Sequence, residues 1–213
     1  MKQWFVLQRQ PLREDDWLLD IFSLSAGRLR VISQAMVGRD EPDLLCLCQG
    51  DWQQGQDFPR VKASEVIARP NLQGVPLYCA VYITELLARL MPQHESHPTV
   101  FTLYLDTLNA LADTPLVDPW LRHFEFQLLQ QLGYGFSWQK DTLGNNIEPS
   151  SHYVFSGGEG FVLAAKGYSG AVILAIGNGD YQFPTALNVA KLILRQALEA
   201  QLTRPLISRE LFI

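Results

Sequence analysis

The stretch AGRLRVI, residues 26–32, sets the fold of the first third of the chain. A small-residue turn opens it, and apolar residues then occupy every second position. In an extended strand this alternation places Arg28 and Arg30 on one face and Leu29 and Val31 on the other. The stretch therefore predicts a half-buried β-strand whose outer face is basic.

Four further apolar runs lie in the first 70 residues, separated by polar segments typical of turns. They are residues 4–7, 17–22, 44–48 and 60–68. Together with residues 28–32 they make five short strands, and Pro70 ends the region. Five strands joined by turns are typical of a small barrel of the OB type.

From residue 76 the apolar residues recur at three- and four-residue steps, which is the period of an amphipathic helix. We predict helices over residues 77–91, from 98, over 118–132 and over 185–202, with short strands at 152–155, 161–165 and 172–176. The fold class is therefore α+β. An N-terminal five-stranded OB-type barrel, residues 1–75, precedes a mainly α-helical domain, residues 76–213, with a small irregular, β-containing insertion at 136–183.

Composition and charge exclude several classes of protein. The chain has 213 residues, 47% of them hydrophobic, and a formal net charge of −5 from 17 basic and 22 acidic residues. A generally basic nucleic-acid binder is excluded, although a local basic patch is not. Three cysteines are too few for a secreted disulfide framework, and no apolar run reaches the length of a membrane span. We expect a cytoplasmic protein without a membrane segment.

No motif has the spacing of a catalytic or metal site. His94 and His97 lie between two prolines in a predicted loop, for which solvated histidines are favoured and a metal site is the alternative. We interpret Cys46 and Cys48 as small buried hydrophobic residues rather than as half of a zinc site. The glycines at 157–160 lack the Lys-Ser/Thr pair of a phosphate-binding loop. The sequence predicts no catalytic residue, no cofactor and no metal.

Two groups of cations are candidate binding residues. Arg28 and Arg30, with Arg60 and Lys62 on the neighbouring predicted strand, are placed to meet phosphates, although so few cations make a weak site. Arg122 lies near the start of a predicted helix. A cation above an apolar surface suits a peptide that ends in an aromatic residue and a free carboxylate. On the residues alone, an ordinary surface arginine is the favoured alternative.

Seven stretches of the chain, taken in order, form a recognisable series. They are FVL at 5–7 with LLD at 18–20 and GRLR at 27–30, then LYCAVYITELLARL at 77–90, LRHFE at 121–125, LGYG at 132–135 and RPLISRELF at 204–212. This series resembles the RecO family of recombination mediators and covers almost the whole chain. The resemblance implies an OB barrel followed by a helical domain, in agreement with the periodicity.

The resemblance also implies a function, and it involves no catalysis. RecO-like proteins bind single-stranded DNA, anneal complementary strands and, with RecR, help to load recombinase onto strands coated by single-stranded-DNA-binding protein (SSB). The acidic, Phe-terminated tail of SSB is the family's docking ligand. We therefore expect a non-enzymatic DNA repair and recombination mediator, cytoplasmic and associated with the nucleoid. The alternative is a protein-interaction module with weak or no direct DNA binding, acting only through SSB and RecR.

Individual residues gain roles from the same resemblance. Arg122 matches the first arginine of the family's Leu-Arg-Arg-Phe-Glu motif, which implies that it clamps the carboxylate of the SSB tail, next to Leu121. His123 replaces the second arginine and weakens the cationic site at neutral pH. The family's basic loop is reduced here to Arg39 beside two acids, which implies weaker DNA binding. Many relatives carry a four-cysteine zinc module after Leu-Gly-Tyr-Gly, but residues 136–151 contain no cysteine, so we expect a metal-free version.

Overall fold

A computed structural model describes residues 1–13, 15–34 and 41–208 of the chain. These residues form two compact units. The first is Met1–Pro115 together with residues 206–208, and the second is Leu116–Pro205. Each unit is described by itself below. The predicted domain boundary at residue 75 stays a prediction.

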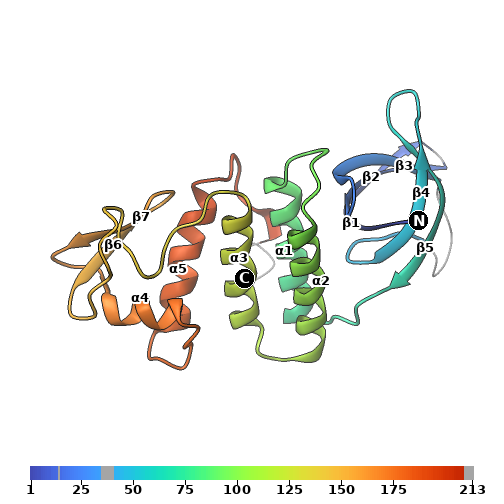
Figure 1. The fold of residues 1–213 in the computed structure, drawn as a ribbon. Coiled ribbons are helices and arrows are strands. Elements are labelled where there is room, and N and C mark those ends of the chain that lie inside the picture. Colours follow the sequence, from blue (N-terminus) through green and yellow to red (C-terminus); the bar gives the residue numbers. More distant parts are fainter. Residues whose placement is uncertain (14, 35–40, 209–213) are drawn as a thin grey trace. The chain divides into compact units, whose positions relative to one another are not determined.

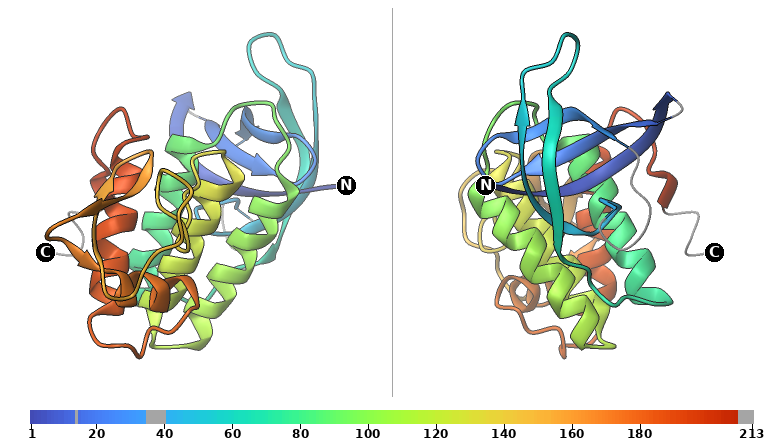
Figure 2. Two further views of the ribbon diagram at one scale, coloured as in Figure 1. Left: turned by 60° about the vertical axis from the view of Figure 1, so that its left-hand side comes forward. Right: turned by 90° about the vertical axis from the view of Figure 1, so that its right-hand side faces the viewer.

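The first unit begins with a closed five-stranded barrel, in the strand order β1-β2-β3-β5-β4 (Figure 1). Its strands are β1 (Lys2–Arg13), β2 (Asp16–Ser23), β3 (Gly27–Gln34), β4 (Leu47–Gln53) and β5 (Arg60–Ala68). The pairing of β3 with β5 is parallel, and the other four pairings are antiparallel. The predicted OB-type barrel and the α+β fold class are confirmed. In Figure 2 the connection between β4 and β5 projects beyond the other strands as a long hairpin.

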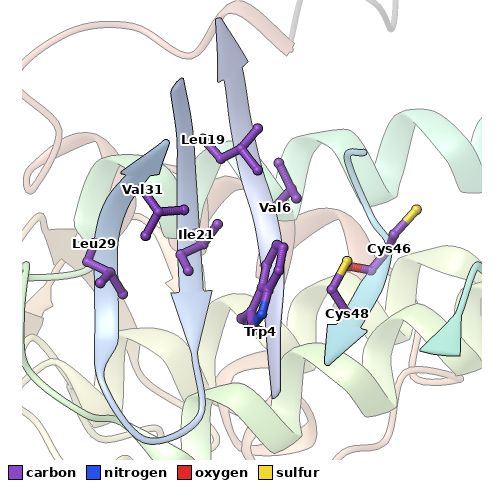
Figure 3. Packing of buried hydrophobic residues seen from close by; sticks show 8 residues of the cluster. All are labelled: Trp4, Val6, Leu19, Ile21, Leu29, Val31, Cys46 and Cys48. Carbon is purple, nitrogen blue, oxygen red and sulfur yellow. The ribbon is translucent and has the colours of Figure 1, made fainter. Parts of the chain in front are cut away.

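The barrel is filled by side chains that alternate along its strands. In β3 the odd-numbered residues are buried and the even-numbered ones face outward, as the sequence predicted. The buried cluster in Figure 3 consists of Trp4, Val6, Leu19, Ile21, Leu29, Val31, Cys46 and Cys48. Both cysteines are free thiols, and burial raises the pKa of Cys48 to about 12. They therefore act as small hydrophobic residues, as we expected.

One predicted strand is misplaced. Residues 44–48 were expected to be extended, but β4 runs from Leu47 to Gln53. Leu45 has a φ of 67°, in the left-handed region that a branched side chain rarely adopts, so the chain bends there before the strand begins. The polar stretch after Cys48 then continues the strand, because its backbone pairs with β5 on one side and its start pairs with β1 on the other.

Two helices pack on the outer face of the barrel within the first unit. They are α1 (Val75–Leu90) and α2 (Pro98–Asp113), and Pro98 occupies the first turn of α2 as predicted. The ring of Phe5 in β1 meets Phe101 of α2 at 5.1 Å and Tyr104 at 4.8 Å, edge to face in the latter case. The Tyr104 hydroxyl lies 2.7 Å from the hydroxyl of Thr84 in α1, which satisfies a fully buried polar group.

The end of the described chain attaches to α1. The backbone N–H groups of Ile207 and Ser208 donate hydrogen bonds to the carboxylate of Glu85, at 3.1 and 2.8 Å. Burial raises the pKa of Glu85, but hydrogen bonds from Ser208, Ile207 and Arg89 outweigh that effect and hold the pKa below its usual value. The carboxylate therefore fastens the terminal segment in its ionised form.

The second unit contains three helices and a small sheet. These are α3 (Val117–Gln131), α4 (Gly170–Gly177), α5 (Ala186–Glu199) and a sheet in the order β7-β6-β8, with β6 (His152–Ser156), β7 (Gly160–Ala164) and β8 (Tyr168–Ser169). The run at 172–176, predicted as a strand, lies in α4. A short apolar run does not distinguish a strand from a buried helix, and here Ile173 and Ile176 are buried at the three-residue spacing of a helix.

An aromatic cluster stabilises the region after α3. The resemblance places a four-cysteine zinc module in this region of many relatives. The Phe136 ring lies 4.7 Å from that of Phe155, 4.9 Å from Trp138, 5.5 Å from Phe126 and 5.8 Å from Phe161. These contacts join the end of α3, the following loop and the sheet into one apolar core. Tilted and edge-to-face rings at such distances add to the stabilisation from burial.

Candidate functional site

The first candidate surface is the outward face of β3 and the adjoining strand β5. Arg28 and Arg30 both lie on the outward side of β3, and Ile32 of β3 pairs with Arg60 of β5. The predicted cations of the two strands are thus brought into one barrel wall. These cations differ in one respect: some of them already form an ion pair with a carboxylate, and others do not.

Arg28 is held by an internal ion pair. Its Nη2 lies 2.8 Å from Oδ2 of Asp20, and its Nε donates to both oxygens of the same carboxylate at 3.1 and 3.2 Å. A third nitrogen, Nη1, donates to the backbone carbonyl of Met91 at 3.2 Å. The side chain is only 14% exposed. Arg28 therefore ties the barrel to the end of α1, and its guanidinium is largely occupied.

Arg60 is also paired. Its Nη1 and Nη2 donate to the two oxygens of Asp16, at 2.8 and 3.0 Å. This hydrogen bonding from the guanidinium lowers the pKa of Asp16, so the pair stays charged at neutral pH. Two parallel N–H···O bonds are the strong geometry for an arginine and a carboxylate. A phosphate at Arg60 would have to compete with Asp16.

Arg30 and Lys62 remain available on this wall. Both are exposed, and neither forms an ion pair with a carboxylate of the described residues. Lys62 lies in a bulge of β5, because Ala63 pairs with Asp51 and Val61 with Trp52, which leaves Lys62 without a partner in the register. The fifth predicted cation, Arg39, lies outside the described residues.

Two further cations at the barrel were not identified from the sequence. Nζ of Lys2 lies 4.0 Å from the ring centroid of Trp52, and the Arg9 guanidinium lies 3.9 Å from that of Trp17. Both tryptophans pack against the barrel core. The partners come from different strands, so no local spacing signalled these pairs.

The second candidate site lies on α3, in the other unit. Nη2 of Arg122 lies 2.8 Å from Oε1 of Glu125, and the two side chains are 5% and 2% exposed. The expectation of a cation on an exposed helix surface is therefore wrong. Replacement of Arg122 by alanine would remove the ion-pair partner of a buried carboxylate. The glutamate three residues later in LRHFE is the signal that predicts such a pair.

Other groups around Arg122 define its surroundings. Its Nε is buried and has no hydrogen-bond partner among the described residues. Leu121 is buried at 5% exposure, whereas His123 and Trp120 are exposed. Burial raises the pKa of Tyr181, while the charge of Arg122 lowers it and that of Glu125 raises it.

Within the part of the chain that the structure describes, no three His, Cys, Asp or Glu side chains are grouped so as to hold a metal ion. The expectation of a metal-free protein stays a prediction. None of the helices described here combines the length and the hydropathy needed to span a bilayer.

Comparisons with known proteins identify the sequences to which this chain is similar. The family model described as "Recombination protein O C terminal" matches residues 72–210. Proteins named "DNA repair protein RecO" are similar over nearly the whole chain. The one from Stutzerimonas stutzeri is 37% identical, covering 98% of this chain and 92% of its own length, and that from Pseudomonas paraeruginosa is 36% identical, covering 98% and 93%. The one from Aliivibrio salmonicida is 32% identical, covering 100% and 95%. This chain belongs to the RecO family of DNA repair proteins.

Proposed function

We propose that this protein is a non-enzymatic recombination mediator that binds single-stranded DNA and the C-terminal tail of SSB. With RecR it promotes strand annealing and the loading of recombinase, in the cytoplasm at the nucleoid. Membership of the family supports a role in DNA repair and recombination. The proposed binding of single-stranded DNA and of the SSB tail rests on the two candidate sites described above.

The DNA-binding part of the proposal is carried by Arg30 and Lys62, which are exposed on the wall formed by β3 and β5. Each phosphate that a cation neutralises adds about 0.7 to the salt dependence of binding to a single strand. Two contacts therefore give a weak site whose affinity falls by only about a factor of seven between 50 and 200 mM salt.

A second candidate function is favoured by the ion pairs. Arg28 and Arg60 are each held by an aspartate through at least two hydrogen bonds. Two of the four candidate DNA-binding cations that the structure describes are thus neutralised within the barrel. A module with weak or no direct DNA binding, which acts only through SSB and RecR, fits this charge distribution.

The SSB-tail part of the proposal depends on Arg122. Its buried Nε–H has no described acceptor, although one face of the guanidinium already serves Glu125. A carboxylate that reached this donor would satisfy a group that is costly to leave unpaired. Because Arg122 is buried, tail binding requires local opening around α3, and we expect slow association with the peptide.

Fluorescence anisotropy of a labelled dT oligonucleotide at 50 and 200 mM salt separates the two functions. The first requires binding at low salt whose salt slope falls by about 0.7 in Arg30→Ala and in Lys62→Ala, but not in the control Arg195→Ala, which removes an exposed cation on α5. The second requires no oligonucleotide binding together with retained binding of a Phe-terminated acidic peptide. A wild-type protein that binds neither the oligonucleotide nor the acidic peptide would refute both functions.

Calorimetry with the same peptide tests Arg122 itself. Arg122→Lys keeps a positive charge beside Glu125 but removes the planar fork that binds a carboxylate through two bonds. We expect at least tenfold weaker peptide binding, whereas the control Arg195→Lys, on the exposed face of α5, leaves binding unchanged. Equal peptide affinity in the two variants would remove Arg122 from the proposal.

A further inference from the structure

We infer that Trp52 is a stacking platform for one unpaired base, with Lys2 and Lys62 placed to meet the adjoining phosphates. The ligand class is single-stranded nucleic acid, so this inference rests on the DNA-binding part of the proposed function. It adds a contact at an indole that the sequence did not single out, and it assigns a role to the tryptophan rather than to charge alone.

The geometry of Trp52 suits stacking. The indole packs against the barrel core on one side and is only partly buried. Nζ of Lys2 lies 4.0 Å from the ring centroid. A lysine ammonium keeps its charged end in contact with water, so its position marks the accessible side of the ring. A flat base placed over that side would occupy the space that the ammonium now takes.

Two lysines lie on the strands that pair with the strand of Trp52. Lys2 is brought there by the pairing of β1 with β4, in which Lys2 lies opposite Gly50. Lys62 occupies the bulge directly beside Trp52, and bulges in strands frequently re-aim a side chain next to a functional site. Neither lysine forms an ion pair with a carboxylate in the described parts of the chain. Both ammonium groups are therefore available to a phosphate.

The pair of Arg9 and Trp17 is the comparison for Trp52, because there the cation is fixed over the ring. We call this pair the closed pair. The Arg9 guanidinium lies 3.9 Å from the ring centroid of Trp17, but its Nη1 is also 3.2 Å from Glu41 and 3.7 Å from Asp43. Two carboxylates hold that cation over the ring. At Trp52 the cation has no such anchor, and a lysine is a flexible point charge that can move from the ring to a phosphate.

Stacking on an aromatic residue tolerates any base, because every base has a flat π face. It requires bases that are not already stacked in a duplex. The structure therefore points to binding with little sequence preference, directed to unpaired strands. Removal of one such platform weakens binding by about five- to a hundredfold in single-strand binders.

The test compares two ligands and two tryptophans by fluorescence anisotropy at low salt. One ligand is a labelled dT oligonucleotide, and the other is an abasic phosphodiester strand of the same length and charge. Trp52→Leu is compared with Trp17→Leu, a matched change at the closed pair, and circular dichroism confirms that each variant is folded. If Trp52→Leu does not fold, Trp52→Phe and Lys2→Gln replace it, since the first keeps a smaller ring and the second leaves the core untouched.

We expect Trp52→Leu to weaken dT binding at least fivefold and to leave abasic binding unchanged, while Trp17→Leu changes neither. For the replacement variants, Lys2→Gln lowers the salt slope by about 0.7 and Trp52→Phe loses part of the dT affinity. Equal losses on both ligands in a Trp52 variant, or no loss on dT in that variant, would overturn the platform while leaving the proposed DNA binding in place. A wild-type protein that binds neither ligand would overturn the platform and the proposed DNA binding together.

Discussion

Removal of the Arg122 guanidinium is the change for which the structure gives the sharpest expectation. Arg122 and Glu125 are both buried, at 5% and 2% side-chain exposure, and their closest atoms are 2.8 Å apart. In Arg122→Ala the Glu125 carboxylate stays in the interior without its counter-charge. Breaking a buried pair in this way costs about 3–5 kcal/mol of unfolding free energy. For a chain of this size, that is a fall of about 6–20 °C in the melting temperature.

A second ion pair in the same unit provides the control. Arg195 and Glu199 on α5 have almost the same separation, 2.9 Å, but their side chains are 59% and 45% exposed. Water screens such a pair, so Arg195→Ala should cost less than about 1 kcal/mol. The difference between the two variants therefore compares a buried with an exposed ion pair at nearly the same separation.

Urea unfolding followed by far-ultraviolet circular dichroism gives the free energy of unfolding of both variants. The double replacement Arg122→Met with Glu125→Leu is measured in the same way. Exchange of both buried charges for apolar side chains of similar size removes the uncompensated carboxylate and should restore most of the stability. The reasoning is refuted if Arg122→Ala costs no more than Arg195→Ala. It is also refuted if the double variant is as unstable as the single one.

Three further predictions concern other parts of the chain. The pKa of Glu85 is lowered in the folded protein, so its stabilising contact with residues 206–208 is complete above its unfolded pKa of about 4.3 and is lost as the pH falls through the folded value. Hydrogen exchange at the amides of Ile207 and Ser208 should therefore show faster opening below about pH 4, and Glu85→Gln should remove this pH dependence. Phe136→Ala should cost about 3–5 kcal/mol in chemical unfolding, because four aromatic rings lose their common neighbour, whereas replacement of the exposed Leu143 by alanine should have little effect. Purified protein should contain no stoichiometric zinc by elemental analysis, and EDTA should leave its melting temperature unchanged; a metal content near one per chain would contradict this.

Much of the architecture follows from local patterns in the sequence. The alternation at 26–32 predicted both the strand β3 and the face on which Arg28 and Arg30 lie. Pro98 begins α2, and Gly133, with a φ of 80°, follows the end of α3, which the sequence placed at residue 132. These features depend on neighbours a few residues apart, whose steric preferences do not need the rest of the fold.

The errors arose where local preference was ambiguous or overruled. The apolar run at 172–176 suits a buried strand or a buried helix equally, and the fold uses it as α4. Leu45 adopts a left-handed backbone that its side chain disfavours, which delays the start of β4. The exposed position assumed for Arg122 was wrong because a helical period identifies which residues share a face, but not what covers that face.

The sequence by itself determined the barrel, the helices other than α4, the family and five candidate cations for DNA binding. The tertiary structure decided which of those cations are available. Asp20 holds Arg28 across two strands, and Asp16 holds Arg60 although 44 residues separate them in the chain. A cation's capacity to bind phosphate depends on the carboxylates within a few ångströms of it, since attraction between charges falls with distance and with exposure to water. Such neighbours are brought together only when the chain folds, and that is why Trp52 with its unanchored Lys2 emerged from the structure alone.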